Sequence, residues 1–145
     1  MILISHRGNI NGKQLNKENA PFYVNNALKL GFNVEIDVWW YNNNFYLGHD
    51  KPMYKIKKEY LQDYRLWCHA KNIEALYQMV NRNIHCFYHQ TDDVTLTSKG
   101  YLWTSPNKTL TKKSVMVLPE IQNLEIPTKI HGLCSDVIEN YEEYR

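Results

Sequence analysis

The sequence predicts a single α/β domain built on parallel strands. A short apolar run at 2–4 is followed by apolar residues at helical spacing over 21–30 and by strict alternation over 33–39. A strand, a helix and a second strand in this order usually form a right-handed β-α-β unit. The chain of 145 residues fits one domain, residues 1–145.

The helix over 21–30 has a start and a stop signal. Asn19 is a suitable capping residue, Pro21 is tolerated in the first turn, and Gly31 ends the apolar pattern. In the next strand, Val34, Ile36 and Val38 share one face and Glu35 and Asp37 the other. Asparagines at 42–44 predict a tight turn and a hairpin return over 45–47.

The remaining elements are shorter. Asn72 is expected to cap a helix in which Ile73, Leu76 and Val80 recur at helical spacing. After residue 90 the connections are too short or too polar for full helices. We expect further strands at 65–69, 84–88, 101–103, 115–118 and 130–134, and a short helix over 56–64.

Composition excludes several protein classes. Hydrophobic residues make up 43% and charged residues 22% of the chain, which argues against disordered, collagen-like and coiled-coil proteins. No apolar run approaches the roughly 20 residues that span a bilayer, and the N-terminus lacks a basic leader region. We therefore expect a soluble, cytoplasmic protein with no transmembrane segment.

The net charge of +2 is too weak for a bulk nucleic-acid surface, although it allows a local basic patch. Composition does not predict the oligomeric state.

The three cysteines, Cys68, Cys86 and Cys134, each lie in an apolar segment and show no C-x-x-C spacing. We expect buried, reduced thiols rather than zinc ligands or disulfides.

Polar residues follow the apolar strands at their carboxyl ends. Because ligands bind outside the carboxyl ends of parallel strands, we expect these residues to converge at one mouth. They are His6, Arg7, Glu35, Asp37, His69, Lys71, His89, Glu120, Ser135 and Asp136.

Glu35 and Asp37 form a pair of carboxylates on one face of a strand, roughly 7 Å apart. Such a pair usually lies on a solvated face, but if both faces of the sheet are covered the two charges need a partner. Oxygen ligands favour Mg²⁺ or Ca²⁺, and an imidazole from His69 would also accept Mn²⁺ or Zn²⁺.

Two histidines could transfer protons near such an ion. His6 and His49 each follow a strand, and imidazoles titrate close to the working pH. Arg7 and Lys71 form a plausible clamp for a phosphate, Arg7 as a bidentate fork and Lys71 as a point charge.

Taken in order, these motifs resemble the glycerophosphodiester phosphodiesterase family, within the phosphatidylinositol-phospholipase-C-like phosphodiesterases. The strong motifs are His6-Arg7-Gly8, Glu18-Asn19, Glu35-x-Asp37 and Gly48-His49-Asp50. Weaker similarity follows at 67–71, 102–104 and 132–136, so the resemblance touches both ends of the chain.

The resemblance implies metal-dependent hydrolysis of a small phosphodiester. His6 and His49 would be the acid/base pair, and Glu35 and Asp37 would bind Mg²⁺ or Ca²⁺, with Mn²⁺ as an alternative. Arg7 and Lys71 would hold phosphate oxygens, and Glu18 would be a further ligand or an anchor of the first loop.

His69 stands where the family has a third carboxylate. Either His69 binds the metal, or two carboxylates and water hold it more weakly, or the metal has a reduced role.

The resemblance also implies a TIM-like barrel. Such a barrel takes about 31 residues per βα unit, and this chain offers about 18. We therefore expect a reduced TIM-like (β/α) barrel with several helices missing, mainly in the C-terminal half.

The sequence leaves two other functions open, and the substrate head group is not predicted. One is a phosphodiester-binding module without turnover, suggested by His69, and the other is a phospholipase-type lyase that releases a cyclic phosphate. His89, Trp103 and Glu120 are weaker candidates for binding substrate.

Overall fold

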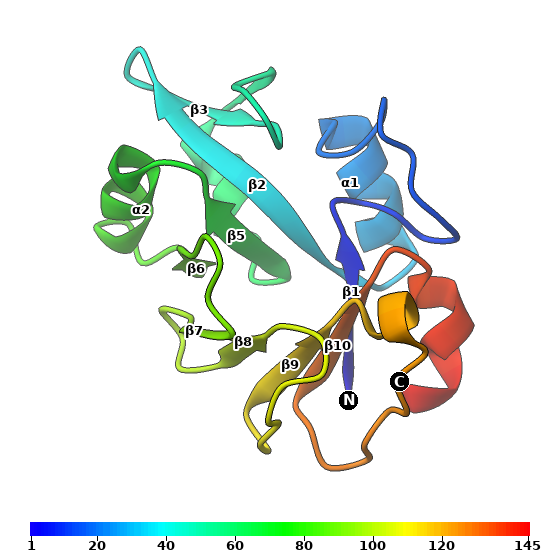
Figure 1. Cartoon of the computed structure of the whole chain (residues 1–145). Coiled ribbons are helices and arrows are strands. Elements are labelled where there is room, and N and C mark those ends of the chain that lie inside the picture. The colour runs from blue at the N-terminus through cyan, green and yellow to red at the C-terminus, as the bar shows by residue number, and fades with distance from the viewer.

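The structure is a computed structural model that describes residues 1–145. It is one mixed sheet of 10 strands that curls on itself, with the α-helices on one part only (Figure 1). The strands are β1 (Ile2–His6), β2 (Asn33–Tyr41), β3 (Asn44–Leu47), β4 (Tyr54–Ile56), β5 (Leu66–Ala70), β6 (Cys86–Phe87), β7 (Val94–Leu96), β8 (Leu102–Thr104), β9 (Ser114–Val117) and β10 (Gly132–Ser135). The helices are α1 (Pro21–Lys29), α2 (Ile73–Val80) and three 3-10 helices, η1 (Lys58–Gln62), η2 (Pro119–Gln122) and η3 (Ile138–Tyr144).

Parallel pairing runs through the middle of the sheet. The order β6-β5-β2-β1-β10-β9-β8 contains only parallel neighbours, so the carboxyl ends of all these strands lie along the same edge. The first and last strands are neighbours, with Ile2 opposite Gly132. The chain ends meet as well, because the Met1 ammonium group donates to the Tyr144 carbonyl at 3.0 Å.

The predicted TIM-like barrel is wrong. β3, β4 and β7 run antiparallel to their neighbours, and no backbone pairing joins β6 to β8, so the sheet is a curled half-barrel. α-Helices follow only β1 and β5, whereas a TIM barrel has one after each strand. The physical reason is that the chain is too short here for a full βα unit. β6 has only two residues, and the chain after it forms the antiparallel pair β7–β8 instead of a crossover helix.

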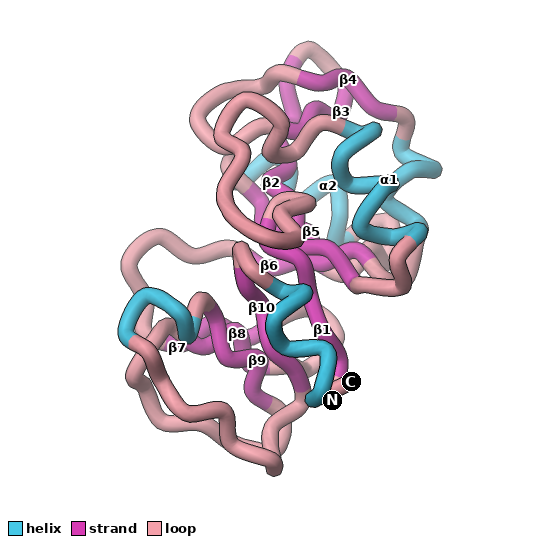
Figure 2. Tube along the Cα trace, turned by 90° about the vertical axis from the view of Figure 1, so that its right-hand side faces the viewer, coloured by secondary structure: helices cyan, strands magenta, loops and turns pink.

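The sheet is packed differently on its two faces. Beneath α1 and α2 lies the largest hydrophobic cluster, which includes Val34, Ile36 and Val38 of β2. A second cluster, around Ile4, Trp67 and Trp103, fills the inner side of the curl. In Figure 2 the α-helices and β2 to β5 form the upper part of the molecule, and β7 to β10 the lower part.

Most predicted elements are confirmed within one or two residues, including α1, β2, β3, β5 and α2. β4 and β7 were not predicted, because each is a three-residue antiparallel strand without a buried apolar run. The helix expected over 56–64 is divided between β4 and the 3-10 helix η1.

The prediction that Asn19 caps α1 is wrong. The capping position is Ala20, with no side-chain hydrogen bond. Asn19 adopts a left-handed backbone conformation (φ 65°), and its side chain binds Asp37 on β2 instead.

All three cysteines are buried and free, as the sequence predicts. No helix has the length and apolar character needed to cross a membrane.

Asn72 joins α2 to the sheet, which allows a test of the packing. Its Oδ1 accepts from the Ala75 and Trp40 amides at 3.1 Å, and its Nδ2 donates to the Trp40 carbonyl at 2.9 Å. We expect Asn72→Ala to lower the free energy of unfolding by about 2–3 kcal/mol, because a cap and two β2 contacts are lost together. Urea unfolding measures this change. The stability of Asn72→Asp, which keeps the hydrogen-bond acceptor but loses the donor, should fall between those of the parent chain and the alanine variant. A change below about 0.5 kcal/mol in the alanine variant would contradict the structural role of Asn72.

Candidate functional site

The strand register builds the site. His6 on β1 lies opposite Glu35 on β2, and Asp37 lies opposite His69 on β5. Because side chains alternate along a strand, the valines and isoleucine of β2 pack under the α-helices while Glu35 and Asp37 point to the inner side. Both carboxylates are buried, with exposed fractions of 2% and 0%.

A cavity of about 490 Å³ opens at the carboxyl ends of these strands. Its lining is mostly polar and carries several cationic or imidazole side chains. The residues that line it include His6, Arg7, Lys13, Glu35, His49, His69, Lys71, Tyr88, His89, Gln90, Trp103 and Ser105.

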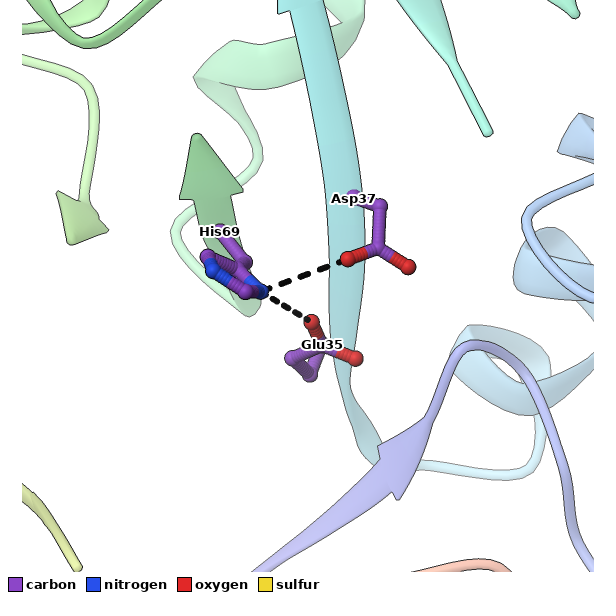
Figure 3. Close-up of side chains that lie close together, drawn as sticks. All are labelled: Glu35, Asp37 and His69. Atoms are coloured by element: carbon purple, nitrogen blue, oxygen red, sulfur yellow. Dashed lines mark ion pairs between the residues drawn. The ribbon is translucent and has the colours of Figure 1, made fainter. Parts of the chain in front are cut away.

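Glu35, Asp37 and His69 form a compact cluster on the strands (Figure 3). One ligand atom from each lies within 4.8 Å of the others. His69 Nδ1 lies 3.3 Å from Asp37 Oδ1 and 3.9 Å from Glu35 Oε1. Glu35 Oε2 and Asp37 Oδ1 are buried without a hydrogen-bond partner, which is costly for a carboxylate unless a cation binds there.

The two carboxylates differ in acidity because their neighbours differ. Burial and the charge of Asp37 raise the pKa of Glu35. Burial also opposes ionisation of Asp37, but the adjacent His69 ring and the charges of Arg7 and Lys71 outweigh it and hold the pKa of Asp37 well below its usual range. A bound cation would favour the ionised form of Glu35 as well.

His6 is held in place by Asp136, the residue after β10. Its Nδ1 donates to Asp136 Oδ1 at 2.7 Å, and its Nε2 lies 3.7 Å from Glu35 Oε2. Burial alone would lower the pKa of His6, but the Asp136 hydrogen bond and the Glu35 charge outweigh burial and raise the pKa. The hydrogen bond orients the ring with Nε2 toward the carboxylate cluster.

Arg7 and Lys71 lie beside Asp37, where they also border the cavity. Arg7 Nε is 3.0 Å from Asp37 Oδ2, and its Nη1 donates to Glu18 at 3.2 Å. Lys71 Nζ is 3.7 Å from Asp37 Oδ1. These two cations are therefore already partly neutralised by protein carboxylates.

Glu18 anchors the loop after β1 and is not part of the carboxylate-histidine cluster. Its oxygens accept from Arg7 and from Asn9 Nδ2, the latter at 2.8 Å. Of the two roles that the sequence allows for Glu18, the contacts therefore match the anchor.

His49 lies at the rim of the cavity and is the most exposed of the predicted site residues. Its side chain is 43% exposed, and its Nδ1 lies 2.7 Å from Asp50 Oδ1. The carboxylate of Asp50 is itself open to solvent, so this contact orients the ring only weakly.

The weaker candidates separate into two groups. His89 and Trp103 line the cavity, and the His89 ring stacks on His69 with centroids 4.6 Å apart. Burial and the neighbouring His69 lower the pKa of His89 to about 4. Glu120 does not line the cavity: its Oε1 accepts from the Asp136 amide at 2.9 Å, so it supports the residue that holds His6.

The sequence did not single out several residues that complete the site. Asp136 and Asn19 appear in motifs of the family resemblance and as a strand end and a helix cap, but the sequence assigned neither of them a role at the site. Asn9 donates to both Glu18 and Asp136 at 2.8 Å, and Lys13 lies 3.6 Å from Asp136 Oδ2. Their positions near strand ends were the only signal in the sequence. Asp136, for example, is more than 100 residues away from His6 and Asn9, the residues that it contacts.

Comparison of the chain with family models, with curated proteins and with solved structures finds no match.

Proposed function

We propose that this protein is a metal-dependent phosphodiester hydrolase. The observation that carries the proposal is the cluster of Glu35, Asp37 and His69, in which two buried carboxylate oxygens accept no hydrogen bond. Glu35 and His69 of this cluster line a cavity that also holds His6 and Lys71. The proposed activity is that of the glycerophosphodiester phosphodiesterases, which the ordered motifs of the sequence resemble.

The donor set fits a divalent cation. Glu35 and Asp37 would supply oxygens and His69 a nitrogen, a mixture that suits Mn²⁺ at least as well as Mg²⁺ or Ca²⁺. When bound, such an ion neutralises phosphate charge and lowers the pKa of an attacking hydroxyl.

His6 is the best-placed group for proton transfer. The Asp136 contact fixes one ring nitrogen, so Nε2 is the nitrogen that can accept a proton from the nucleophile or return one. His49, across the same cavity, would exchange a proton with the leaving alkoxide. The nucleophile is either water or a neighbouring hydroxyl of the substrate.

Arg7 and Lys71 would contact the phosphate oxygens. Lys71 can turn toward a ligand because the one carboxylate with which it pairs is 3.7 Å away, whereas Arg7 is held by two carboxylates. Arg7 would therefore act mainly by keeping Asp37 ionised, with the rest of its guanidinium facing the ligand.

Removal of the metal gives the direct test. We expect hydrolysis of glycerophosphocholine or bis-p-nitrophenyl phosphate with Mn²⁺ or Mg²⁺, a fall of at least about 100-fold on adding EDTA, and recovery when the ion is restored. Reaction in ¹⁸O-labelled water separates the routes, because a cyclic phosphate released without the label indicates the lyase. Full activity in EDTA would rule out the metal role.

A phosphodiester-binding module without turnover is the second candidate. His69 favours it, because its Nδ1 already lies 3.3 Å from Asp37 Oδ1, where a bound cation would otherwise be the neighbour. Calorimetric binding of glycerol phosphate to a protein that hydrolyses none of the diesters with any of these ions would support this alternative.

A further inference from the structure

One face of the β2–β3–β4 unit combines aromatic and lysine side chains, and along β2 it continues the face that carries Glu35 and Asp37. The antiparallel register places Trp39, Tyr46 and Lys55 in one row across three strands. Residues on the opposite face, such as Phe45 and Leu47, pack into the core instead. Tyr41 extends the row along β2. We call this surface the hairpin face. Lys51 lines a hollow beside its aromatic rings, and Lys57 follows the last residue of β4.

The segment that contains and flanks β4 is locally basic. Lys51, Lys55, Lys57 and Lys58 fall within eight residues of sequence that contain no acidic residue, although the whole chain carries a net charge of only +2. All four are exposed, and none forms an ion pair. The positive charge on and next to the hairpin face is therefore free to act on a partner.

The same surface presents apolar and aromatic groups to solvent. Tyr41 is 55% and Met53 52% exposed, and Tyr41 and Tyr46 contact each other with ring centroids 6.2 Å apart. A hollow of about 470 Å³ lies between the aromatic rings of β2 and β3 and the segment that contains Lys51 and Pro52.

The hairpin face is continuous with the cavity rim. Trp39 Nε1 donates to the Gly48 carbonyl at 2.7 Å, in the residue directly before His49. In Figure 1 the β2–β3 hairpin extends beyond the end of β5, on the side where the parallel strands end. A surface bound to the hairpin face would thus lie next to the mouth of the cavity.

We infer that the hairpin face docks on a bilayer that contains anionic phospholipids. Exposed lysines are attracted by the negative surface of such a bilayer. Tyrosine and tryptophan rings favour the head-group region, because each ring has an apolar body and a polar group that stays in contact with water. Lysines also prevent edge strands from pairing with other sheets, but that role does not require aromatic residues beside them. This inference does not depend on the proposed function, because it concerns binding alone.

A bilayer suits the observations better than a nucleic acid. The free cations are all lysines, which act as point charges on flexible stems, whereas specific phosphate recognition favours the bidentate fork of arginine. The one nearby arginine, Arg82, is engaged by Gln78 through its Nη1 and lies over the Trp40 ring.

The test is co-sedimentation of the full chain with vesicles, in EDTA so that catalysis plays no part. We expect binding to vesicles of phosphatidylcholine mixed with phosphatidylserine, little binding to pure phosphatidylcholine, and loss of binding at high salt. The triple variant K51Q/K55Q/K57Q should lower the partition coefficient by about 100-fold, at about 5-fold per lysine. Tyr41→Ser should weaken binding further without changing the net charge.

A matched control removes three other exposed lysines that form no ion pair. The variant K112Q/K113Q/K129Q has the same change in net charge, and its lysines precede β9 and β10, at the amino ends of the parallel strands. It should bind the mixed vesicles as tightly as the parent chain. Equal losses in the two triple variants, no binding to mixed vesicles, or binding of a single-stranded oligonucleotide in preference to the vesicles would each overturn the inference.

Discussion

His6→Ala is expected to lower kcat for a phosphodiester substrate by at least about 100-fold, the usual contribution of a positioned general acid or base. The ring lies in the cavity, its Nδ1 is engaged by Asp136, and its Nε2 is directed toward the carboxylate cluster. His69 lies against the carboxylates of the proposed metal cluster and His49 contacts an exposed carboxylate, so neither ring is positioned as that of His6 is. Initial rates with bis-p-nitrophenyl phosphate at saturating metal measure the effect.

The matched control for this variant is His131→Ala. His131 stacks on Tyr101 at the opposite end of the strands and does not line the cavity, so its removal should leave kcat unchanged. Asp136→Asn should give an intermediate loss, because the ring keeps a neighbour but loses the charge that supports its protonated form. Full activity in His6→Ala, with an unfolding midpoint close to that of the parent chain, would remove His6 from the mechanism.

Asp37→Asn is expected to weaken binding of Mn²⁺ by at least about 100-fold. Residues that only hydrogen-bond to a metal ligand typically contribute 10- to 100-fold to metal affinity, and a residue that binds the metal directly should contribute more. Asp37 is fully buried and lies within 4.0 Å of His69, Arg7 and Lys71, so all three lose their common counter-charge. The free energy of unfolding should fall by about 3–5 kcal/mol without metal for the same reason. Titration calorimetry with Mn²⁺ and urea unfolding measure the two effects separately.

Asp93→Asn provides the comparison for Asp37. Asp93 also contacts a lysine, at 3.1 Å, but its side chain is 66% exposed. A solvated ion pair contributes about 0–1 kcal/mol, so both metal affinity and stability should stay near the values of the parent chain. If Asp37→Asn binds Mn²⁺ as tightly as Asp93→Asn does, the cluster is not a metal site.

Much of the candidate site follows from local patterns. Alternation along β2 predicted that Glu35 and Asp37 share a face, and burial of the opposite face by Val34, Ile36 and Val38 turned both carboxylates inward. The strand-end positions of His6 and Lys71 likewise predicted the mouth, because parallel strands end along one edge.

The supporting contacts could not be predicted in the same way. Asp136 reaches His6 across 130 positions of sequence, through the pairing of β1 with β10. Asn19 matched a helix cap by residue type, yet a left-handed backbone at that position directs its amide to Asp37. Such pairings depend on which strands become neighbours, and residue spacing does not contain that information.

The sequence by itself determined the local elements and the chemistry they carry: a β-α-β start, two carboxylates on one face of a strand, and histidines and cations at strand ends. Only the tertiary structure decided how the sheet ends. Helical and strand periodicity are set by neighbours a few residues apart, whereas barrel closure depends on whether β6 and β8 can pair. β6 and β8 do not pair, because β6 has only two residues and the chain returns after it as an antiparallel strand pair. The chain therefore folds as a curled half-barrel, and its candidate metal ligands still meet at one edge of the sheet.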